Sequence, residues 1–272
     1  MLFFHIIQLI VVKIINNELN DILFNSIIGD NYNLASIYNY NYDNIKIKHQ
    51  SQHNISNKII CIFGVLVNKN GIKIEKEMLN WLLPEYNTYC VYQKYPGELY
   101  EYPGLRFAQW MLQEYNKTIL LYLHTKGAFN LNIYQLYIRK LWKNEFKYPR
   151  NKIYIQSILT NKTDISIPFR KDRNTWFNGM FISKRAFDII PQIPVSKNRY
   201  FYEGNLFNAT NIRIKGLIDD NQSPFTIVNV IPQYLFLQKK NKIIITILEL
   251  ILFGFIIIIK LYINNAFKIF YI

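Results

Sequence analysis

The central part of the chain alternates between short apolar runs and longer stretches in which apolar residues recur at helical spacing. Residues 59–67 read IICIFGVLV, and such a continuous apolar run is typical of a strand that a parallel sheet buries on both faces. Residues 88–93 and 118–123 predict a second and a third strand of this kind. The apolar positions of residues 74–82 and of residues 105–115 each fall on one stripe of a helix. This β-α-β-α-β order predicts an α/β fold with a Rossmann-type, mostly parallel sheet flanked by helices.

Further elements are expected after the third strand, and no internal repeat is visible. Helices are predicted at about residues 133–147 and 151–160, and short strands at about 165–168, 176–183 and 226–231. The α/β domain is therefore expected to occupy residues 58–237.

Residues 1–57 are expected to form a polar lead-in with a short apolar N-terminus. Residues 16–57 are rich in Asn and Tyr and only weakly periodic, which favours irregular structure. The preceding MLFFHIIQLIVV is apolar except for His5 and Gln8. It has no basic residue ahead of the apolar run and no small-residue cleavage site, so it predicts a short buried helix or strand and not a signal peptide.

The C-terminal part of the chain is strongly apolar. Residues 243–259 contain a single charged side chain, Glu249, and continuing to Ile263 gives about the 20 residues that cross ~30 Å of hydrocarbon. The pattern predicts a transmembrane helix at 243–263 and a short tail at 264–272; the alternative is a wholly buried core helix.

Lysines around this segment indicate an orientation in the membrane. Lys239, Lys240 and Lys242 precede the apolar segment, whereas Lys260 and Lys268 follow it. The excess of positive charge on the N-terminal side predicts a single-pass protein with a C-terminal anchor and a cytosolic N-terminal portion.

The charge balance of the chain is strongly basic. The sequence has 32 Lys+Arg against 18 Asp+Glu, a formal net charge of +14. The lysines are scattered, whereas a nucleic-acid interface shows a clustered basic face, so no nucleic-acid partner is expected. Attraction to an anionic membrane surface or to a phosphorylated substrate fits this charge equally well. Two cysteines, Cys61 and Cys90, are too few for a disulfide framework or a zinc cluster.

The third predicted strand ends in polar residues. It leads into His124, Thr125 and Lys126, and Gly127 then allows the backbone to turn sharply. Ligands of open α/β sheets bind at the carboxyl ends of the strands, where a lysine and a histidine can neutralise or hydrogen-bond a diphosphate. An ordinary exit from strand to loop is the alternative.

Two segments carry a resemblance to a known family. They are GLRFAQWMLQEYNKTILLYLHTKG at residues 104–127 and WFNGMFISKRAF at residues 176–187, separated by a helix with Arg139 and Trp142. Together they resemble glycosyltransferase-like proteins related to rhamnan synthesis protein F. The resemblance covers roughly residues 58–215 and implies a GT-A-type fold that uses nucleotide sugars.

The resemblance also implies site residues. His124, Thr125 and Lys126 match the His-Thr-Lys motif and, with Gly127 and Arg139, are expected to bind the donor. The acceptor side is expected to include Trp176, Asn178, Gly179, Met180 and Phe181, of which the last three match a Gly-x-Met-Phe pattern that is one residue shorter here. Trp176 is a candidate stacking surface for a sugar ring, with core packing as its alternative. Glu203 is expected to be the catalytic base.

The metal requirement stays open. The chain contains no Asp-x-Asp motif, the usual metal and diphosphate clamp of GT-A enzymes. Without it, Lys126, with Arg139 or Arg170, would offset the charge of the leaving diphosphate. His124 and Glu203 are the candidate ligands for Mn²⁺ or Mg²⁺.

Two functions therefore remain as hypotheses. The first is a membrane-anchored glycosyltransferase that moves a sugar from a nucleotide-sugar donor to a glycan or lipid-linked acceptor, as in polysaccharide biosynthesis. The second is a catalytically inactive, membrane-tethered binding protein that retains the fold. The His-Thr-Lys motif favours the first, and the missing Asp-x-Asp favours the second.

Overall fold

A computed structural model describes residues 2–38, 42–50, 59–95, 99–115, 117–129, 131, 133–169, 179–190, 192–198, 201–202, 206–207 and 211–218. The elements in this part of the chain, in order, are α1 (Leu2–Ser26), α2 (Leu34–Ile37), β1 (Ile45–Gln50), β2 (Ile60–Val67), α3 (Lys69–Glu85), β3 (Asn87–Lys94), α4 (Tyr102–Glu114), β4 (Ile119–His124), α5 (Ile133–Phe146), α6 (Asn151–Leu159), β5 (Ile165–Phe169), β6 (Met180–Ser183), α7 (Lys184–Ile189) and β7 (Ile214–Ile218).

The described strands form one mixed, mostly parallel sheet. It has seven strands in the order β1-β3-β2-β4-β6-β5-β7. Strands β2, β3 and β4 run parallel to one another, which confirms the β-α-β-α-β prediction. Strand β6 runs antiparallel to both β4 and β5, and β5 pairs in parallel with β7. Strand β1 closes the other edge, antiparallel to β3.

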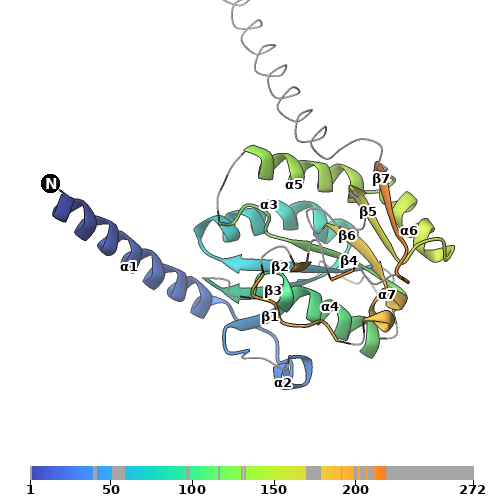
Figure 1. Cartoon of the computed structure of the whole chain (residues 1–272), viewed down its shortest axis with the longest axis horizontal. Helices are drawn as coiled ribbons and strands as arrows, with labels where there is room; N and C mark the ends of the chain where they lie inside the picture. Colours follow the sequence, from blue (N-terminus) through green and yellow to red (C-terminus); the bar gives the residue numbers. More distant parts are fainter. Residues whose placement is uncertain are drawn as a thin grey trace, which may run out of the picture. The chain divides into compact units, whose positions relative to one another are not determined.

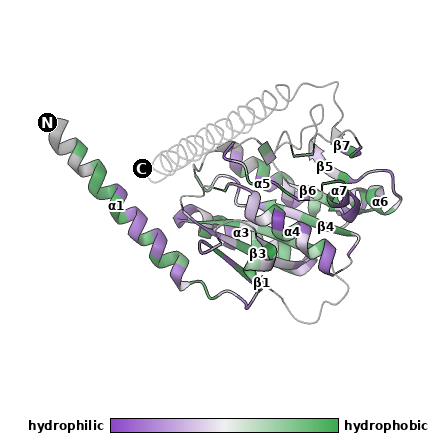
Figure 2. Ribbon diagram, turned by 60° about the horizontal axis from the view of Figure 1, so that its bottom comes forward, coloured by the Kyte–Doolittle hydropathy of each residue, from purple (hydrophilic) through white to green (hydrophobic). Residues whose placement is uncertain are grey.

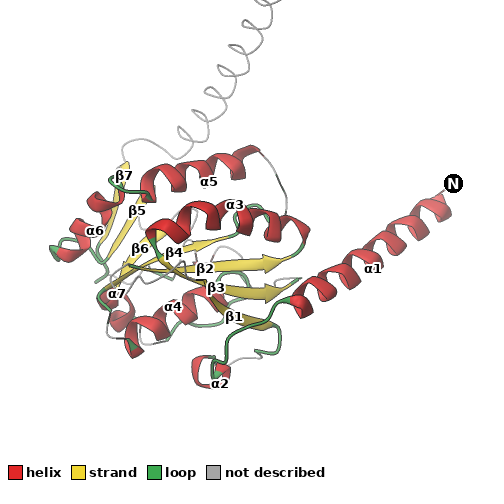
Figure 3. Ribbon diagram, turned by 180° about the vertical axis from the view of Figure 1, so that it is seen from behind, coloured by secondary structure: helices red, strands yellow, loops and turns green. Residues whose placement is uncertain are grey.

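Helices cover both faces of the sheet (Figures 1 and 3). On one face, α3, α5 and α6 bury apolar side chains such as Met78, Trp142 and Tyr154 against the strands. On the other face, α2, α4 and α7 contribute Ile37, Leu105 and Phe187 to a second core. Each central strand contributes residues to both cores, because successive side chains point to opposite faces of the sheet, and apolar residues therefore follow one another along β2 and β4.

The lead-in contains regular structure that the sequence analysis did not expect. Residues 45–50 form the edge strand β1, and their alternation places Ile45 and Ile47 in the core with Lys46 and Lys48 partly exposed. The prediction of irregular structure was therefore wrong for this segment. Its IKIK pattern is the period-two alternation of a half-buried strand, which the surrounding Asn and Tyr residues obscured.

The N-terminal apolar segment forms a long helix and is not buried as expected. Helix α1 has 25 residues, and its side chains from Leu9 to Ile15 are exposed. Figure 2 shows both hydrophobic and hydrophilic residues along this helix. Among the described residues, no helix combines the length and the apolar character needed to cross a membrane.

The C-terminal predictions lie outside the described residues. The chain divides into two compact units, residues 1–221 and 222–272, and the second unit is not described. The predicted strand at 226–231, the transmembrane helix at 243–263 and the tail at 264–272 fall in that unit and remain predictions.

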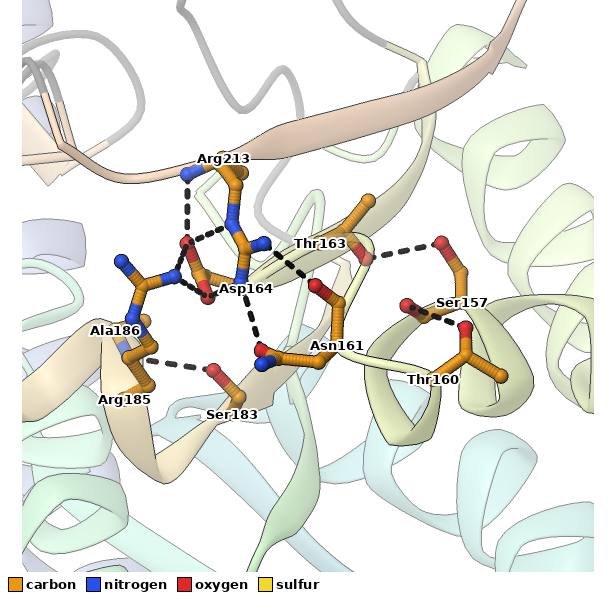
Figure 4. A network of polar contacts seen from close by, with 9 residues as sticks. All are labelled: Ser157, Thr160, Asn161, Thr163, Asp164, Ser183, Arg185, Ala186 and Arg213. Carbon is orange, nitrogen blue, oxygen red and sulfur yellow. Dashed lines mark hydrogen bonds and ion pairs between the residues drawn. The ribbon is translucent and has the colours of Figure 1, made fainter.

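A buried carboxylate ties three elements together at the amino ends of β5 and β7 (Figure 4). Asp164, whose side chain is 1% exposed, accepts hydrogen bonds from Arg185 on α7 and from Arg213 just before β7, at 2.8–3.2 Å. Arg213 also donates to Asn161. Burial by itself raises the pKa of Asp164, but the hydrogen bonds and charges of the two arginines outweigh it and hold the pKa below its ordinary value.

Candidate functional site

The strand order creates a switch point between β2 and β4. From β2 the chain moves to β3 on one side, and it then returns through α4 to β4 on the other side of β2. The connections that leave the carboxyl ends of β2 and β4 therefore diverge. In open α/β sheets this divergence opens a crevice in which ligands bind.

A cavity of about 250 Å³ lies at this switch point. It is bounded by the ends of the three parallel strands, the loop after β4 and the first turn of α4. The lining residues are Gly64, Val65, Leu66, Val91, Gln93, Tyr100, Glu101, Pro103, Gly104, Tyr122, His124, Thr125, Lys126, Gly127, Ala128, Phe129 and Gln135. Four predicted donor-binding residues, 124–127, thus lie together in its wall.

Thr125 fastens the start of this loop to β2. Its backbone N–H donates to the carbonyl of Gly64 at 2.8 Å, and its hydroxyl accepts from the backbone N–H of Leu66 at 3.0 Å. The residue is 6% exposed. Its side chain therefore continues the β2–β4 pairing beyond the last ladder bond and fixes where His124 and Lys126 lie.

Arg139 supports the same loop from α5. Its guanidinium donates to the backbone carbonyl of Lys126 at 2.7 Å and pairs with Glu77 on α3 at 3.4 Å. The Arg139 side chain is only 5% exposed and is not part of the cavity wall. The structure thus places this predicted donor-binding residue behind the loop, where it positions Lys126.

The turn after Lys126 depends on glycine. Gly127 has φ +95°, a left-handed conformation that side-chain-bearing residues rarely adopt. A Cβ added there would lie 2.8 Å from Cβ of Gln135 and 3.2 Å from the Arg139 guanidinium. The chain turns here, and Asn68 stabilises the next residue by donating to the Ala128 carbonyl at 3.0 Å.

His124 lies between two aromatic rings. Its imidazole is 6.4 Å from the ring of Tyr122 and 5.7 Å, nearly perpendicular, from the indole of Trp142. These rings restrict its orientation, and the partly exposed imidazole borders the cavity.

The predicted acceptor-side motif runs beside the end of β4, but its described side chains serve packing. Met180 pairs with Tyr122 across the antiparallel ladder, and both Met180 and Phe181 are fully buried. Phe181 packs against Tyr86 and Phe146. A Cβ on Gly179 would lie 2.1 Å from the indole nitrogen of Trp142, so this glycine permits close packing of α5.

The remaining predicted site residues lie outside the described part of the chain. They are Arg170, Trp176, Asn178 and the predicted base Glu203. Their roles remain predictions.

Several residues of the cavity wall were not singled out from the sequence. Gln93 comes from the end of β3, Glu101 and Gly104 from the first turn of α4, and Gln135 from α5. Two of these positions could have been inferred from local sequence. Gln93 lies at the carboxyl end of a predicted strand, where ligands bind, and Pro103 indicates that a helix begins beside Glu101 and Gly104. Gln135 could not be inferred in this way, because only packing brings α5 over the loop.

The described residues offer no ready-made metal site. Within them, no group of three His, Cys, Asp or Glu side chains converges on one point. Of the two ligands proposed from the sequence, His124 lines the cavity and Glu203 is outside the described residues.

Comparisons with protein-family models, with curated protein sequences and with solved structures found no match for this chain.

Proposed function

We propose that this chain is a membrane-anchored glycosyltransferase of the GT-A type, which transfers a sugar from a nucleotide-sugar donor to a glycan or lipid-linked acceptor. The observation that carries the proposal is the cavity at the switch point, with Lys126 and His124 held in its wall by Thr125. A site of this kind suits a nucleoside diphosphate, because the carboxyl ends of β2 and β4 supply the crevice and Lys126 supplies positive charge.

The start of α4 borders the same cavity. Glu101, Pro103 and Gly104 at the start of the 13-residue helix line it, so the positive end of the helix dipole and the negative Glu101 carboxylate both lie at its wall. The Glu101 carboxylate and the Gln93 and Gln135 amides are suited to hydrogen-bond hydroxyl groups of a ribose or a hexose.

The proposed reaction breaks the bond between the anomeric carbon of the sugar and the diphosphate oxygen while the acceptor hydroxyl forms a new bond to that carbon. Lys126 offsets the charge that develops on the departing diphosphate. Glu203 removes the proton of the attacking hydroxyl, so that nucleoside diphosphate, protonated base and glycosylated acceptor result. Mn²⁺ or Mg²⁺ is a candidate aid to diphosphate departure.

The proposed location is a membrane with the catalytic domain on the cytosolic side. The predicted span at 243–263 and the lysines before it support this part of the proposal. A bilayer location suits a lipid-linked or nascent glycan acceptor, and the net charge of +14 suits both an anionic surface and a phosphorylated donor.

The second candidate function is a membrane-tethered binding protein without catalysis. It is favoured by the missing Asp-x-Asp motif and by the lack of a convergent metal-ligand group among the described residues. Such a protein would bind nucleotide or glycan in the same cavity.

Binding and transfer assays on the full chain in detergent separate these outcomes. UDP, GDP and dTDP are titrated by calorimetry with and without Mn²⁺, and radiolabelled nucleotide sugars are then tested for transfer to membrane lipid and glycan extracts. Saturable binding together with transfer supports the glycosyltransferase. Binding without transfer supports the second function, and the absence of nucleotide binding overturns the proposed donor site.

A further inference from the structure

Helix α1 carries a belt of exposed apolar side chains around its whole circumference. The exposed apolar residues of its N-terminal half, with exposed fractions of 47–64%, are Ile6, Leu9, Ile10, Val11, Val12, Ile14 and Ile15. Successive residues of an α-helix point about 100° apart, so the four consecutive residues 9–12 alone face all sides of the helix. The belt is therefore not an apolar stripe facing the domain.

The C-terminal half of α1 is fixed to the domain. Lys46 on β1 donates to the carbonyls of Phe24 and Ile27, both at 2.9 Å, where it satisfies groups at the end of the helix. Asp21 pairs with Lys94 on β3 at 3.0 Å, and the Phe24 ring is 4% exposed in the core. These contacts hold one end of the helix, and within the described part of the chain the apolar belt is exposed.

We infer that the N-terminal half of α1 inserts into one leaflet of a lipid bilayer. A protein partner or a second copy of the helix buries one side of a rod and leaves the opposite side in water, whereas acyl chains surround it completely. The helix begins at Leu2, so residues 2–15 extend about 20 Å at 1.5 Å per residue, which is shorter than the ~30 Å hydrocarbon core. With the helix axis tilted, a segment of this length stays within one leaflet and does not cross the bilayer.

The positive net charge of the chain indicates which kind of membrane surface it binds. The net charge of +14 favours a leaflet with anionic headgroups. Lys13, the one charged residue within the belt, is exposed, and its long side chain can extend its ammonium group to the headgroup level. The inference does not rest on glycosyl transfer or on the C-terminal span.

Spin labels on single introduced cysteines test the inference in the full chain. The variants are Leu9→Cys, Ile10→Cys, Val11→Cys and Val12→Cys, with Ile28→Cys as the control, because Ile28 is 81% exposed and lies after α1. Native Cys61 and Cys90 are fully buried and do not compete for the label. Collision of each label with oxygen and with a water-soluble nickel chelate is measured in detergent-free vesicles of phosphatidylcholine, with and without phosphatidylserine.

The inference predicts the same change at all four belt positions. Each label should become several-fold less accessible to the nickel chelate and more accessible to oxygen, most strongly with phosphatidylserine, while the label at position 28 stays accessible to the chelate. Three results would overturn the inference. The first is continued access of the nickel chelate to the labels at all four positions. The second is protection from the chelate on only one side of the helix, which indicates a protein contact, and the third is loss of oxygen access at all four positions, which indicates a helix bundle. A C-terminal span tethers every variant alike, so its presence or failure does not alter this comparison.

Discussion

The guanidinium of Arg139 donates a hydrogen bond to the backbone carbonyl of Lys126 at 2.7 Å, across 13 positions of sequence and from behind the cavity wall. The sequence predicted that both side chains bind the nucleotide-sugar donor. In the structure the two residues have different roles. Lys126 lines the cavity, and Arg139 binds the backbone of Lys126 from outside the cavity wall.

Arg139→Ala should destabilise the fold and weaken nucleotide binding together. The change removes a charge-assisted hydrogen bond and leaves the Lys126 carbonyl without this donor, which costs about 1–3 kcal/mol. Chemical denaturation and calorimetry measure the two effects. Arg150→Ala is the control for binding, because Arg150 forms an ion pair with Glu145 and does not line the cavity, so nucleotide affinity should not change. Unchanged stability in Arg139→Ala would contradict the supporting role.

Lys126→Ala should weaken nucleoside diphosphate binding by about ten- to a hundredfold. The estimate follows from a charge-assisted hydrogen bond of roughly 1.5–3 kcal/mol. Stability should change little, because the Arg139 contact is made to the backbone of Lys126, which the substitution keeps. Calorimetry is compared with Lys143→Ala, an exposed lysine in the last turn of α5. Equal affinity in parent and Lys126→Ala would place the donor elsewhere.

Glu203→Gln should abolish sugar transfer and spare nucleotide binding. Glutamine keeps the size and polarity of the side chain but cannot accept the proton of the acceptor hydroxyl. Radiolabelled transfer and calorimetry on the same preparation give the two readouts. Full transfer activity in this variant would remove Glu203 from the base role.

Gly127→Ala should destabilise the protein by about 1–3 kcal/mol, because alanine is strained at φ +95° and its Cβ meets Gln135. Gly64→Ala is the matched control within the same cavity wall. A Cβ at Gly64 comes no closer than 3.5 Å to its neighbours, which is ordinary contact, so thermal unfolding should shift much less. Similar melting temperatures for the two variants would contradict the turn requirement.

Asp164→Asn should lower the free energy of unfolding at neutral pH by about 3 kcal/mol, the lower end of the range for breaking a buried ion pair, because both arginines are partly exposed. The folded-state pKa of Asp164 lies below the unfolded value of about 3.9. Its stabilisation is therefore fully present above that pH and is lost as the pH falls through the folded-state pKa.

Denaturation of wild type and Asp164→Asn as a function of pH checks this prediction. The difference in stability should be constant at neutral pH and shrink below about pH 4, since asparagine has no carboxyl group to protonate. Asp188→Asn is the control, because Asp188 forms an exposed pair with Lys184 on α7 and should cost within about 1 kcal/mol. A difference that does not change with pH would contradict the role of the Asp164 charge.

Local pattern pointed to four residues of the cavity wall, residues 124–127. The His-Thr-Lys segment was identified because a buried strand ended in polar residues, and the structure places these residues in the cavity wall. The positions of Gln135 and Arg139 could not be read in the same way. They depend on how α5 packs over the loop, and helical periodicity reports which face is apolar but not what the polar face meets.

The sequence by itself determined the parallel centre of this protein. The middle of each of the strands β2, β3 and β4 is buried on both faces, so consecutive residues there are mostly apolar, and the helices between the strands carry one apolar stripe each. The tertiary structure alone decided which strands became neighbours: β1 pairs antiparallel with β3, and β6 enters between β4 and β5. It also decided that the apolar half of α1 lies uncovered. The spacing of apolar residues along the chain indicates which side chains are buried. The element that pairs with a strand edge or packs on a helix face is determined by contacts between distant residues, which local spacing does not encode.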